Sequence, residues 1–387
     1  FSALVGCGLW FTSTEKKNSI FETYADNFCL IRGSNNYTDR VKCSKLKSHL
    51  TNKSSYCSKG SQLTAKFPGQ EKEMKLCQQT LFADKKSSST LRFIILGDTG
   101  KGESEKKGYG QKRVAAGIQA ICSQFENGCD FALLVGDVIY PEGIKSVWDS
   151  RAKVFFDDVY SIISPPMPFY IVSGNHDYHG NINAAIERTY FNDVWRQPHH
   201  HYGIQGLPNW ISIYGLDTTA ISKGKTTSIQ LDAAANHLCN AEGWKFVFGH
   251  HPPDSTGTHG PSGETSEFMN QLNDRCKIDG IFAGHEHHLE HLKHNGYDVF
   301  VQGGGGTTVR DVGHDDNQDR QKFAASQHGF ALVEASQDSV LVSYYTPDTW
   351  IYENGKFKKP VLIKDKAYMC SYSKTGDQGC ASTEISH

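Results

Sequence analysis

The sequence predicts an α/β fold, and three observations lead to this prediction. Short apolar runs rich in Val, Ile and Phe alternate with amphipathic helical patterns. Five of these runs end in a cluster of Gly, Asp, Asn or His. The chain has 387 residues, of which 38% are hydrophobic and 21% charged, so it is long enough to bury a large core. Alternating strands and helices are typical of sheets whose faces are covered by helices.

The predicted elements follow in chain order. The five apolar runs read as buried strands, because their length and their β-branched and aromatic side chains suit a sheet interior. They are LRFIILGDTG (91–100), FALLVGDVIY (131–140), PFYIVSGNHD (168–177), WKFVFGHHP (244–252) and IDGIFAGHEHH (278–288). Helical patterns lie at 111–125, 228–240 and 266–273. Beyond residue 288 strands are predicted at 298–302, 329–334 and 339–345, with a tight, close-approach glycine turn at 303–306.

The two ends of the chain differ from this middle part. Residues 1–88 hold 14 Lys and Arg against 7 Asp and Glu, while the remainder holds 26 against 35. This basic leader lacks sustained periodicity and carries two Asn-x-Ser/Thr sequons, at Asn36 and Asn52. We therefore expect three parts: a Cys-rich N-terminal extension or small module at 1–88, a main domain at 89–357, and a polar, loosely packed C-terminal tail at 358–387.

The cysteines indicate an oxidising compartment. There are 11 of them, five in the leader, and no CxxC pair that would suggest a zinc finger or a thioredoxin-type motif. Cys122 with Cys129, and Cys370 with Cys380, could each close a short loop. The odd cysteine is free, pairs between chains, or has its partner elsewhere. Together with a first residue, Phe1, that fits removal of a signal peptide, this predicts a secreted or extracellular protein, or one of a lysosomal or periplasmic-type compartment.

Composition excludes some partners. No run of 18 apolar residues is present, so no membrane span is predicted. The net charge of −2 indicates no specific nucleic-acid partner.

The strand ends carry side chains that suit a metal site. The carboxyl ends of parallel strands meet at one edge of a sheet, so these side chains are expected to converge. They are Asp98, Asp137 with Tyr140, Asn175 with His176, His250, and His285 with His287. Oxygen donors mixed with imidazoles suit Fe, Zn or Mn. Two such ions about 3.5–4 Å apart can clamp the attacking and leaving oxygens of a phosphoryl transfer.

The blocks GDTG, GDVIY, GNHD, GHHP and GHEHH resemble the five-block signature of the metallophosphoesterases. The Tyr of GDVIY makes the likeness specific to purple acid phosphatases, especially the small tartrate-resistant, animal-type branch. The likeness extends to Leu216-Asp217-Thr218 and His259-Gly260-Pro261 and covers about 91–345, whereas 1–88 has no counterpart. It implies a four-layer sandwich of two mixed β-sheets flanked by helices, with 89–357 as the metallophosphoesterase catalytic domain.

The resemblance also implies roles for individual residues. Asp98, Tyr140 and His287 would hold a first metal, Fe(III). Asn175, His250 and His285 would hold a second, which is Fe(II), Zn or Mn, and Asp137 would bridge both. His176 and His259 would contact the phosphate and assist the leaving group. The chain departs from the family at Thr258, where Glu often precedes the second of these histidines.

The function implied is an acid phosphatase that hydrolyses phosphomonoesters by attack of metal-bound hydroxide. Its substrates would be small phosphate esters or phosphorylated proteins, with phosphoanhydrides as a further class. An alternative hypothesis is an extracellular assembly or structural protein built on a phosphatase fold, with 1–88 mediating homo-oligomerisation. A third is that 1–88 is an inhibitory pro-segment.

Other histidines are expected to be less important. His288, His291 and His294 read as a solvated edge, and His199–His201 as packing or surface residues, with substrate contact as the alternative.

Overall fold

A computed structural model describes most of residues 89–346 and shorter stretches elsewhere. The described residues are 22–24, 28–32, 38–42, 64–65, 74–75, 89–100, 110–315, 320–346, 352–353, 356–357, 368–374 and 378–382. The chain divides into two compact units, residues 1–79 and 80–387. The leader's sequons and the side chains of its five cysteines lie outside the described part.

The first unit contains short antiparallel strands. β1 (Glu22–Tyr24), β2 (Phe28–Arg32) and β3 (Thr38–Lys42) form one sheet in that order. β4 (Thr64–Ala65) and β5 (Met74–Lys75) form a second, two-stranded sheet.

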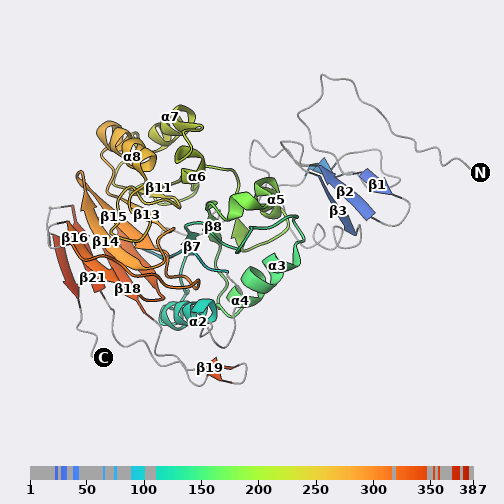
Figure 1. Ribbon diagram of the computed structural model, residues 1–387, viewed down its shortest axis with the longest axis horizontal. Coiled ribbons are helices and arrows are strands. Elements are labelled where there is room, and N and C mark those ends of the chain that lie inside the picture. Colours follow the sequence, from blue (N-terminus) through green and yellow to red (C-terminus); the bar gives the residue numbers. More distant parts are fainter. Residues whose placement is uncertain are drawn as a thin grey trace, which may run out of the picture. The chain divides into compact units, whose positions relative to one another are not determined.

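The second unit is built on two mixed sheets (Figure 1). The eight-stranded sheet has the order β22 (Gln378–Ser382), β21 (Tyr368–Ser373), β18 (Ser339–Tyr345), β17 (Phe330–Ser336), β6 (Thr90–Leu96), β7 (Phe131–Leu134), β8 (Phe169–Ile171), β9 (Trp195–Arg196). The seven-stranded sheet has the order β10 (Tyr202–Gly203), β11 (Ile211–Gly215), β12 (Trp244–Phe248), β13 (Gly280–Ala283), β15 (Tyr297–Gln302), β14 (Leu289–His294), β16 (Gln321–Ala325). β6 to β9 run parallel, as do β11, β12, β13 and β15, and the remaining pairs are antiparallel. A separate hairpin pairs β19 (Tyr352–Glu353) with β20 (Lys356–Phe357).

Aromatic and branched side chains from both sheets form one core between them. The Phe93 ring of β6 stacks on Phe131 of β7 at 4.8 Å and meets Phe282 of β13 edge-on at 6.2 Å. All three are fully buried. Burial of one such side chain stabilises the fold by about 1.5–3 kcal/mol, so these contacts hold the two sheets face to face.

Helices cover the outer faces, which completes four layers (Figure 1). A second apolar cluster joins the seven-stranded sheet to α6 (Thr218–Ile221), α7 (Thr227–Leu238) and α8 (Gly263–Cys276). The other side carries α2 (Gly110–Cys122), α3 (Ser150–Ala152), the π-helical turn Lys153–Asp157, α4 (Asp158–Tyr160), the 3-10 turn Asp177–His179 and α5 (Ile182–Arg188). The predicted α/β sandwich is confirmed, and the three predicted helices are present with ends shifted by a few residues.

The prediction that His288, His291 and His294 lie at a solvated edge is wrong for the first two. His288 and His291 are fully buried. His291 belongs to β14, which lies inside the sheet between β15 and β16, and His288 immediately precedes that strand. The His291 ring lies with Nε2 2.6 Å from Asp298 Oδ1 and Nδ1 2.6 Å from Tyr368 Oη. Buried polar groups are tolerated when they are paired in this way. Only His294 is half-exposed.

The loose packing expected of the C-terminal tail is wrong for residues 368–373. β21 pairs with β18 along its whole length, and Tyr368 and Cys370 are buried in the core between the sheets. The domain boundaries at 88 and 357 stay predictions.

Three disulfides staple the described part of the second unit. The two short-loop pairs, Cys122–Cys129 and Cys370–Cys380, are confirmed. The third, Cys239–Cys276, joins α7 to α8 across 37 residues and was not foreseen. These six cysteines are all paired, and the other five of the chain lie in the leader. Among the described residues, no helix has the length and apolar character needed to cross a membrane.

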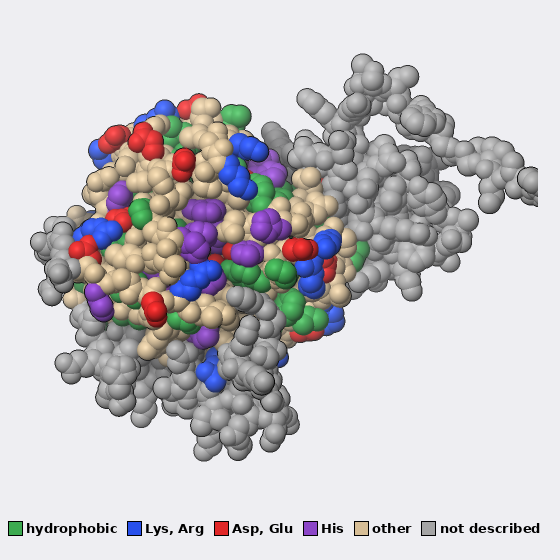
Figure 2. Space-filling model, viewed as in Figure 1, with side chains coloured by type: hydrophobic (Ala, Val, Ile, Leu, Met, Phe, Trp, Pro, Cys, Tyr) green, Lys and Arg blue, Asp and Glu red, His purple; other side chains and the backbone are tan. Residues whose placement is uncertain are grey.

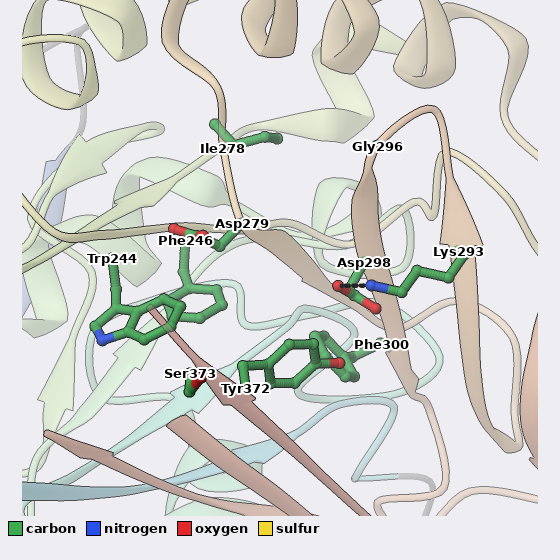
Figure 3. A pocket seen from close by; sticks show the side chains of 10 residues that line it. All are labelled: Trp244, Phe246, Ile278, Asp279, Lys293, Gly296, Asp298, Phe300, Tyr372 and Ser373. Atoms are coloured by element: carbon green, nitrogen blue, oxygen red, sulfur yellow. Dashed lines mark hydrogen bonds and ion pairs between the residues drawn. The ribbon is translucent and has the colours of Figure 1, made fainter. Parts of the chain in front are cut away.

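A cavity of about 240 Å³ lies at the amino ends of β12, β13 and β15 (Figure 3). Its wall is aromatic and charged: Trp244, Phe246, Phe300 and Tyr372 with Asp279, Lys293 and Asp298, of which Lys293 and Asp298 form an ion pair at 2.7 Å. His250 and His285, two of the side chains predicted to bind metal, follow the opposite ends of β12 and β13.

Candidate metal centre

The carboxyl ends of parallel strands from both sheets deliver the predicted side chains to one place. Asp98 follows β6, Asp137 follows β7, and Asn175 follows β8. His250 follows β12 and His285 follows β13 in the other sheet. The two sheets are packed face to face, so five strand ends meet at one edge of the sandwich.

A first group of donors gathers around the Tyr140 hydroxyl. Its oxygen lies 2.9 Å from Asp98 Oδ1, 2.9 Å from Asp137 Oδ2 and 3.2 Å from His287 Nε2. All four side chains are buried. Phenol, carboxylates and imidazole thus converge on one small volume shielded from water.

A second group gathers around the Asn175 amide. Its Oδ1 lies 3.1 Å from His250 Nε2 and 3.1 Å from His285 Nδ1. His250 Nε2 is also 3.4 Å from Asp137 Oδ2. Asp137 therefore borders both groups, in the position of a bridge.

The ring nitrogens that face away from the site are held by backbone carbonyls. His250 Nδ1 lies 2.9 Å from the Val135 oxygen, and His287 Nδ1 lies 2.9 Å from the Thr308 oxygen. A carbonyl only accepts, so each Nδ1 donates, which leaves Nε2 as the free lone pair in a neutral ring. Such outer hydrogen bonds set the tautomer of metal-binding histidines.

The backbone at three of these positions is left-handed. φ is +58° at Asp98, +49° at Asp137 and +69° at His285. Residues other than glycine seldom adopt this region, and such strain is concentrated at functional sites. The turns bring main-chain donors to the carboxylates: His285 N–H donates to Asp98 Oδ2 at 2.9 Å, and His176 N–H donates to Asp137 Oδ1 at 2.8 Å.

Glycines make this closeness possible. A Cβ on Gly174 would lie 2.0 Å from Asp137 Oδ1, and one on Gly305 would lie 2.1 Å from the Gly97 oxygen. The predicted close-approach turn at 303–306 is confirmed by the second of these contacts. Asp177 holds the loop of Gly174 by accepting from its N–H at 2.9 Å and from that of Val138 at 3.1 Å.

The electrostatics of the cluster call for positive charge. Burial, reinforced by the charge of Asp137, raises the pKa of Asp98 to about 8. Burial also raises the pKa of Tyr140 well above its usual 10. For Asp137, burial acts upward but the neighbouring His250 outweighs it and lowers the pKa. Burial lowers the pKa of His250, yet Asp137 and Asp98 outweigh it and raise it to about 9.

These residues fit metal ions. Asp98, Asp137 and His250 have ligand atoms within 4.8 Å of one another, as have His250, His251 and His285. Buried acidic groups held this close are stable when cations neutralise them. The mixed oxygen and nitrogen donors suit Fe, Zn or Mn.

The two predicted catalytic histidines lie at the mouth of the cluster. His176 places Nδ1 2.8 Å from the Pro141 oxygen, and its ring lies 4.3 Å from that of Tyr140. The His259 ring lies 4.4 Å from that of His285, with a side chain 41% exposed. Both can therefore reach a molecule bound over the donors.

Two residues at the mouth were missed from the sequence. The buried Glu286 accepts from the His259 N–H at 2.6 Å with Oε1. Arg310 places Nη1 3.0 Å from His259 Nδ1. The only signal for Glu286 was its position between His285 and His287; no pattern pointed to Arg310, which is 51 residues from His259. The loop that Glu286 contacts carries Thr258 at the position where purple acid phosphatases often have Glu.

Figure 2 shows histidine side chains gathered near the middle of one face, with Lys and Arg side chains beside them. The trio at 199–201 is tied to its surroundings: His201 Nδ1 lies 2.7 Å from Tyr214 Oη, and His200 Nδ1 lies 3.7 Å from Asp217 Oδ2.

A four-layer α/β sandwich with oxygen and nitrogen donors converging at its strand ends defines a metal-dependent phosphoesterase. The sequence profile of the family described as Calcineurin-like phosphoesterase matches residues 91–289. The chain belongs to this family.

Curated relatives are purple acid phosphatases. Tartrate-resistant acid phosphatase type 5 of Oryctolagus cuniculus is 27% identical over 67% of this chain and 88% of its own length. The human enzyme of the same name is 26% identical over the same shares. Purple acid phosphatase 7 of Arabidopsis thaliana is 27% identical over 58% of this chain and 72% of its own. These relatives support phosphatase activity and imply a centre of two metal ions.

Solved structures share the fold. One described as "GAP50 the anchor in the inner membrane complex of Plasmodium" has a TM-score of 0.57 at 22% identity and covers 70% of this chain and 90% of its own. A purple acid phosphatase from yellow lupin (Lupinus luteus) seeds has a TM-score of 0.53 at 15% identity, covering 89% and 59%.

Proposed function

We propose that this protein is an acid phosphatase that hydrolyses phosphomonoesters at a binuclear metal centre. Asp98, Tyr140 and His287 hold a first ion, Fe(III). Asn175, His250 and His285 hold a second ion, which is Fe(II), Zn or Mn. Asp137 bridges them. The substrates are small phosphate esters or phosphorylated proteins.

One observation carries this proposal: seven donor side chains from five strand ends form two adjoining groups that share one carboxylate. Each group contains a residue whose second nitrogen or oxygen is held by the backbone, as in His250 with Val135 and His287 with Thr308. This preorganisation supports a metal site rather than a structural hydrogen-bond network.

The bound ions supply an activated water and neutralise the charge of the phosphoryl oxygens. The protein supplies position and protons. His176 is held against Tyr140 and the Pro141 oxygen, and its role in this proposal is to contact a phosphate oxygen through Nε2. His259 is held by Glu286 at the mouth, where it donates a proton to the departing ester oxygen.

The test is metal content, visible spectrum and turnover of an aryl phosphate at mildly acidic pH, with Asp137→Asn. We expect about two metals per chain and a phenolate-to-iron colour in the wild type. The variant should lose at least about a hundredfold in kcat and part of its metal. Asp232→Asn is the matched control, because this carboxylate is 69% exposed and pairs with Arg275 away from the proposed metal donors. Colourless, inactive wild-type protein after reconstitution with iron and zinc would refute the proposal.

We further propose an oxidising location, secreted or lysosomal, which the three disulfides of the second unit support. The alternative of a purely structural protein is less well supported, because a protein without catalysis has no need of the complete donor set. The anchor named above shares the fold, and its likeness carries no function to this chain.

A further inference from the structure

Arg310 is a cationic side chain at the mouth of the centre. Its Nη1 lies 3.0 Å from Nδ1 and 3.2 Å from Nε2 of His259. The side chain is half-buried, and no described carboxylate lies within ion-pair distance of it. A guanidinium that faces an anion-binding site without a protein carboxylate is available to a ligand.

The backbone sets the place of this guanidinium. Arg310 N–H donates to the His287 oxygen at 3.0 Å. A short bridge joins Val312 to Gly257, and Gly313 N–H donates to the Thr256 oxygen at 3.0 Å. The segment of Arg310 is thus bonded both to the metal-binding strand end and to the loop of His259. These backbone contacts fix the position of the Arg310 side chain beside His259.

Arg310 lies on the side of the site where the leaving group departs, because His259 is the proposed proton donor to that group. A planar guanidinium binds phosphate through two parallel hydrogen bonds, which neither lysine nor imidazole can reproduce. We infer that Arg310 is a specificity-determining residue that binds the second phosphate of a phosphoanhydride substrate. This inference rests on the proposed function and assigns to Arg310 the discrimination between substrates at the same site.

The chemistry of the leaving group supports this assignment. Water adds its oxygen to the terminal phosphorus, and the bridging P–O bond breaks with its electron pair going to the departing phosphate. The two protons of the water pass to the phosphate products or to solvent. A departing phosphate carries several anionic oxygens that can accept two parallel hydrogen bonds from Arg310, whereas an aryl or alkyl leaving group develops charge on a single oxygen and cannot fill both.

The experiment compares two substrates on the full-length, metal-loaded protein. Arg310→Gln is expected to lower kcat/KM for pyrophosphate by about 30-fold, the range of a lost charge-assisted hydrogen bond, and for 4-nitrophenyl phosphate by less than about threefold. Arg310→Lys should give a kcat/KM for pyrophosphate between those of the wild type and Arg310→Gln, because lysine keeps the positive charge but cannot make two parallel hydrogen bonds. Lys223→Gln is the matched control: this exposed cation lies 5.6 Å from the Tyr178 ring and should leave the substrate ratio unchanged.

Binding gives a second readout that needs no turnover. Calorimetry with imidodiphosphate, which is not cleaved at the bridge, should show binding weakened about 10-fold or more by Arg310→Gln, and orthophosphate binding changed by less than about twofold. Equal losses for both ligands or both substrates, or an unchanged ratio, would overturn the assignment. Wild-type protein that cleaves neither substrate would defeat the proposed function, and imidodiphosphate binding would still decide the role of Arg310.

Discussion

Single carboxylates in this protein are placed in surroundings that change their protonation. At the metal centre, burial and like charge disfavour ionisation of Asp98, while the adjacent imidazole favours that of Asp137. Two chemically identical groups 39 residues apart in sequence thus differ because of what the strand ends place beside them. Asp279, in the cavity at the other ends of the strands, offers the clearest test of such an effect.

We expect Asp279→Asn to stabilise the protein at neutral pH. Burial raises the pKa of Asp279 from 3.8 to about 6. The folded state therefore binds this proton more tightly than the unfolded chain does, and ionisation costs stability. The cost is absent below the unfolded pKa, grows as pH rises towards 6, and is complete above it, reaching at most about 3 kcal/mol. The asparagine keeps an oxygen for the Lys245 N–H, which donates at 2.6 Å.

Urea unfolding of variant and wild type below and above this pH window measures the effect. The variant should gain free energy of unfolding only at the higher pH. Asp232→Asn, at an exposed carboxylate, should show no such difference. A gain of the same size at both pH values would contradict the assignment to ionisation.

Among the elements, α7 and α8 are joined by a disulfide bond between residues distant in sequence. Cys239, at the end of α7, is bonded to Cys276, the last residue of α8. These helices cover the sheet that contributes His250 and His285, so their attachment supports one half of the centre. The Cys122–Cys129 bond closes a loop with a sequence separation of only 7, against 37 for the other bond.

Removing the longer bond should cost more stability. By the chain-entropy relation, loss of the Cys239–Cys276 bond costs about 4 kcal/mol and loss of the Cys122–Cys129 bond about 2 kcal/mol. The measurement is denaturant unfolding of the two double alanine variants under identical conditions. An equal or smaller loss for the longer loop would show that strain or residual unfolded structure, and not loop entropy, controls these bonds.

The whole molecule consists of two units, and every proposed catalytic residue lies in the second, 80–387. Deleting residues 1–79 should therefore leave kcat for an aryl phosphate within about threefold of the full chain, because no metal donor is removed. Light scattering alongside the assay tests the role of the leader. Retained activity with a smaller assembly would assign it to oligomerisation, and raised activity would identify an inhibitory segment. Abolished activity would contradict the independence of the second unit.

The sequence by itself determined the α/β class and the main strands of both sheets, and it predicted that seven polar side chains at the strand ends would lie together. It could do so because each of these features depends on residues that are neighbours in the sequence. An apolar run predicts a strand, and the Gly, Asp, Asn or His after it marks the end of that strand. Parallel strands place such ends at one edge of each sheet, which brings Asp98 beside Asp137. His250 belongs to the other sheet and reaches them because the two sheets pack face to face.

The tertiary structure decided what depends on contacts between distant segments. The burial of His291 follows from the position of β14 inside the sheet, and the ordering of 368–373 follows from pairing with β18. The sequence around His291 predicts a surface strand, because the hydrogen-bond partners that allow its burial, Asp298 and Tyr368, come from other strands. The same holds for Glu286 and Arg310, whose contacts with His259 arise only when two loops meet. Local sequence patterns predict individual strands and helices. The contacts between side chains of distant segments form only when the whole chain has folded.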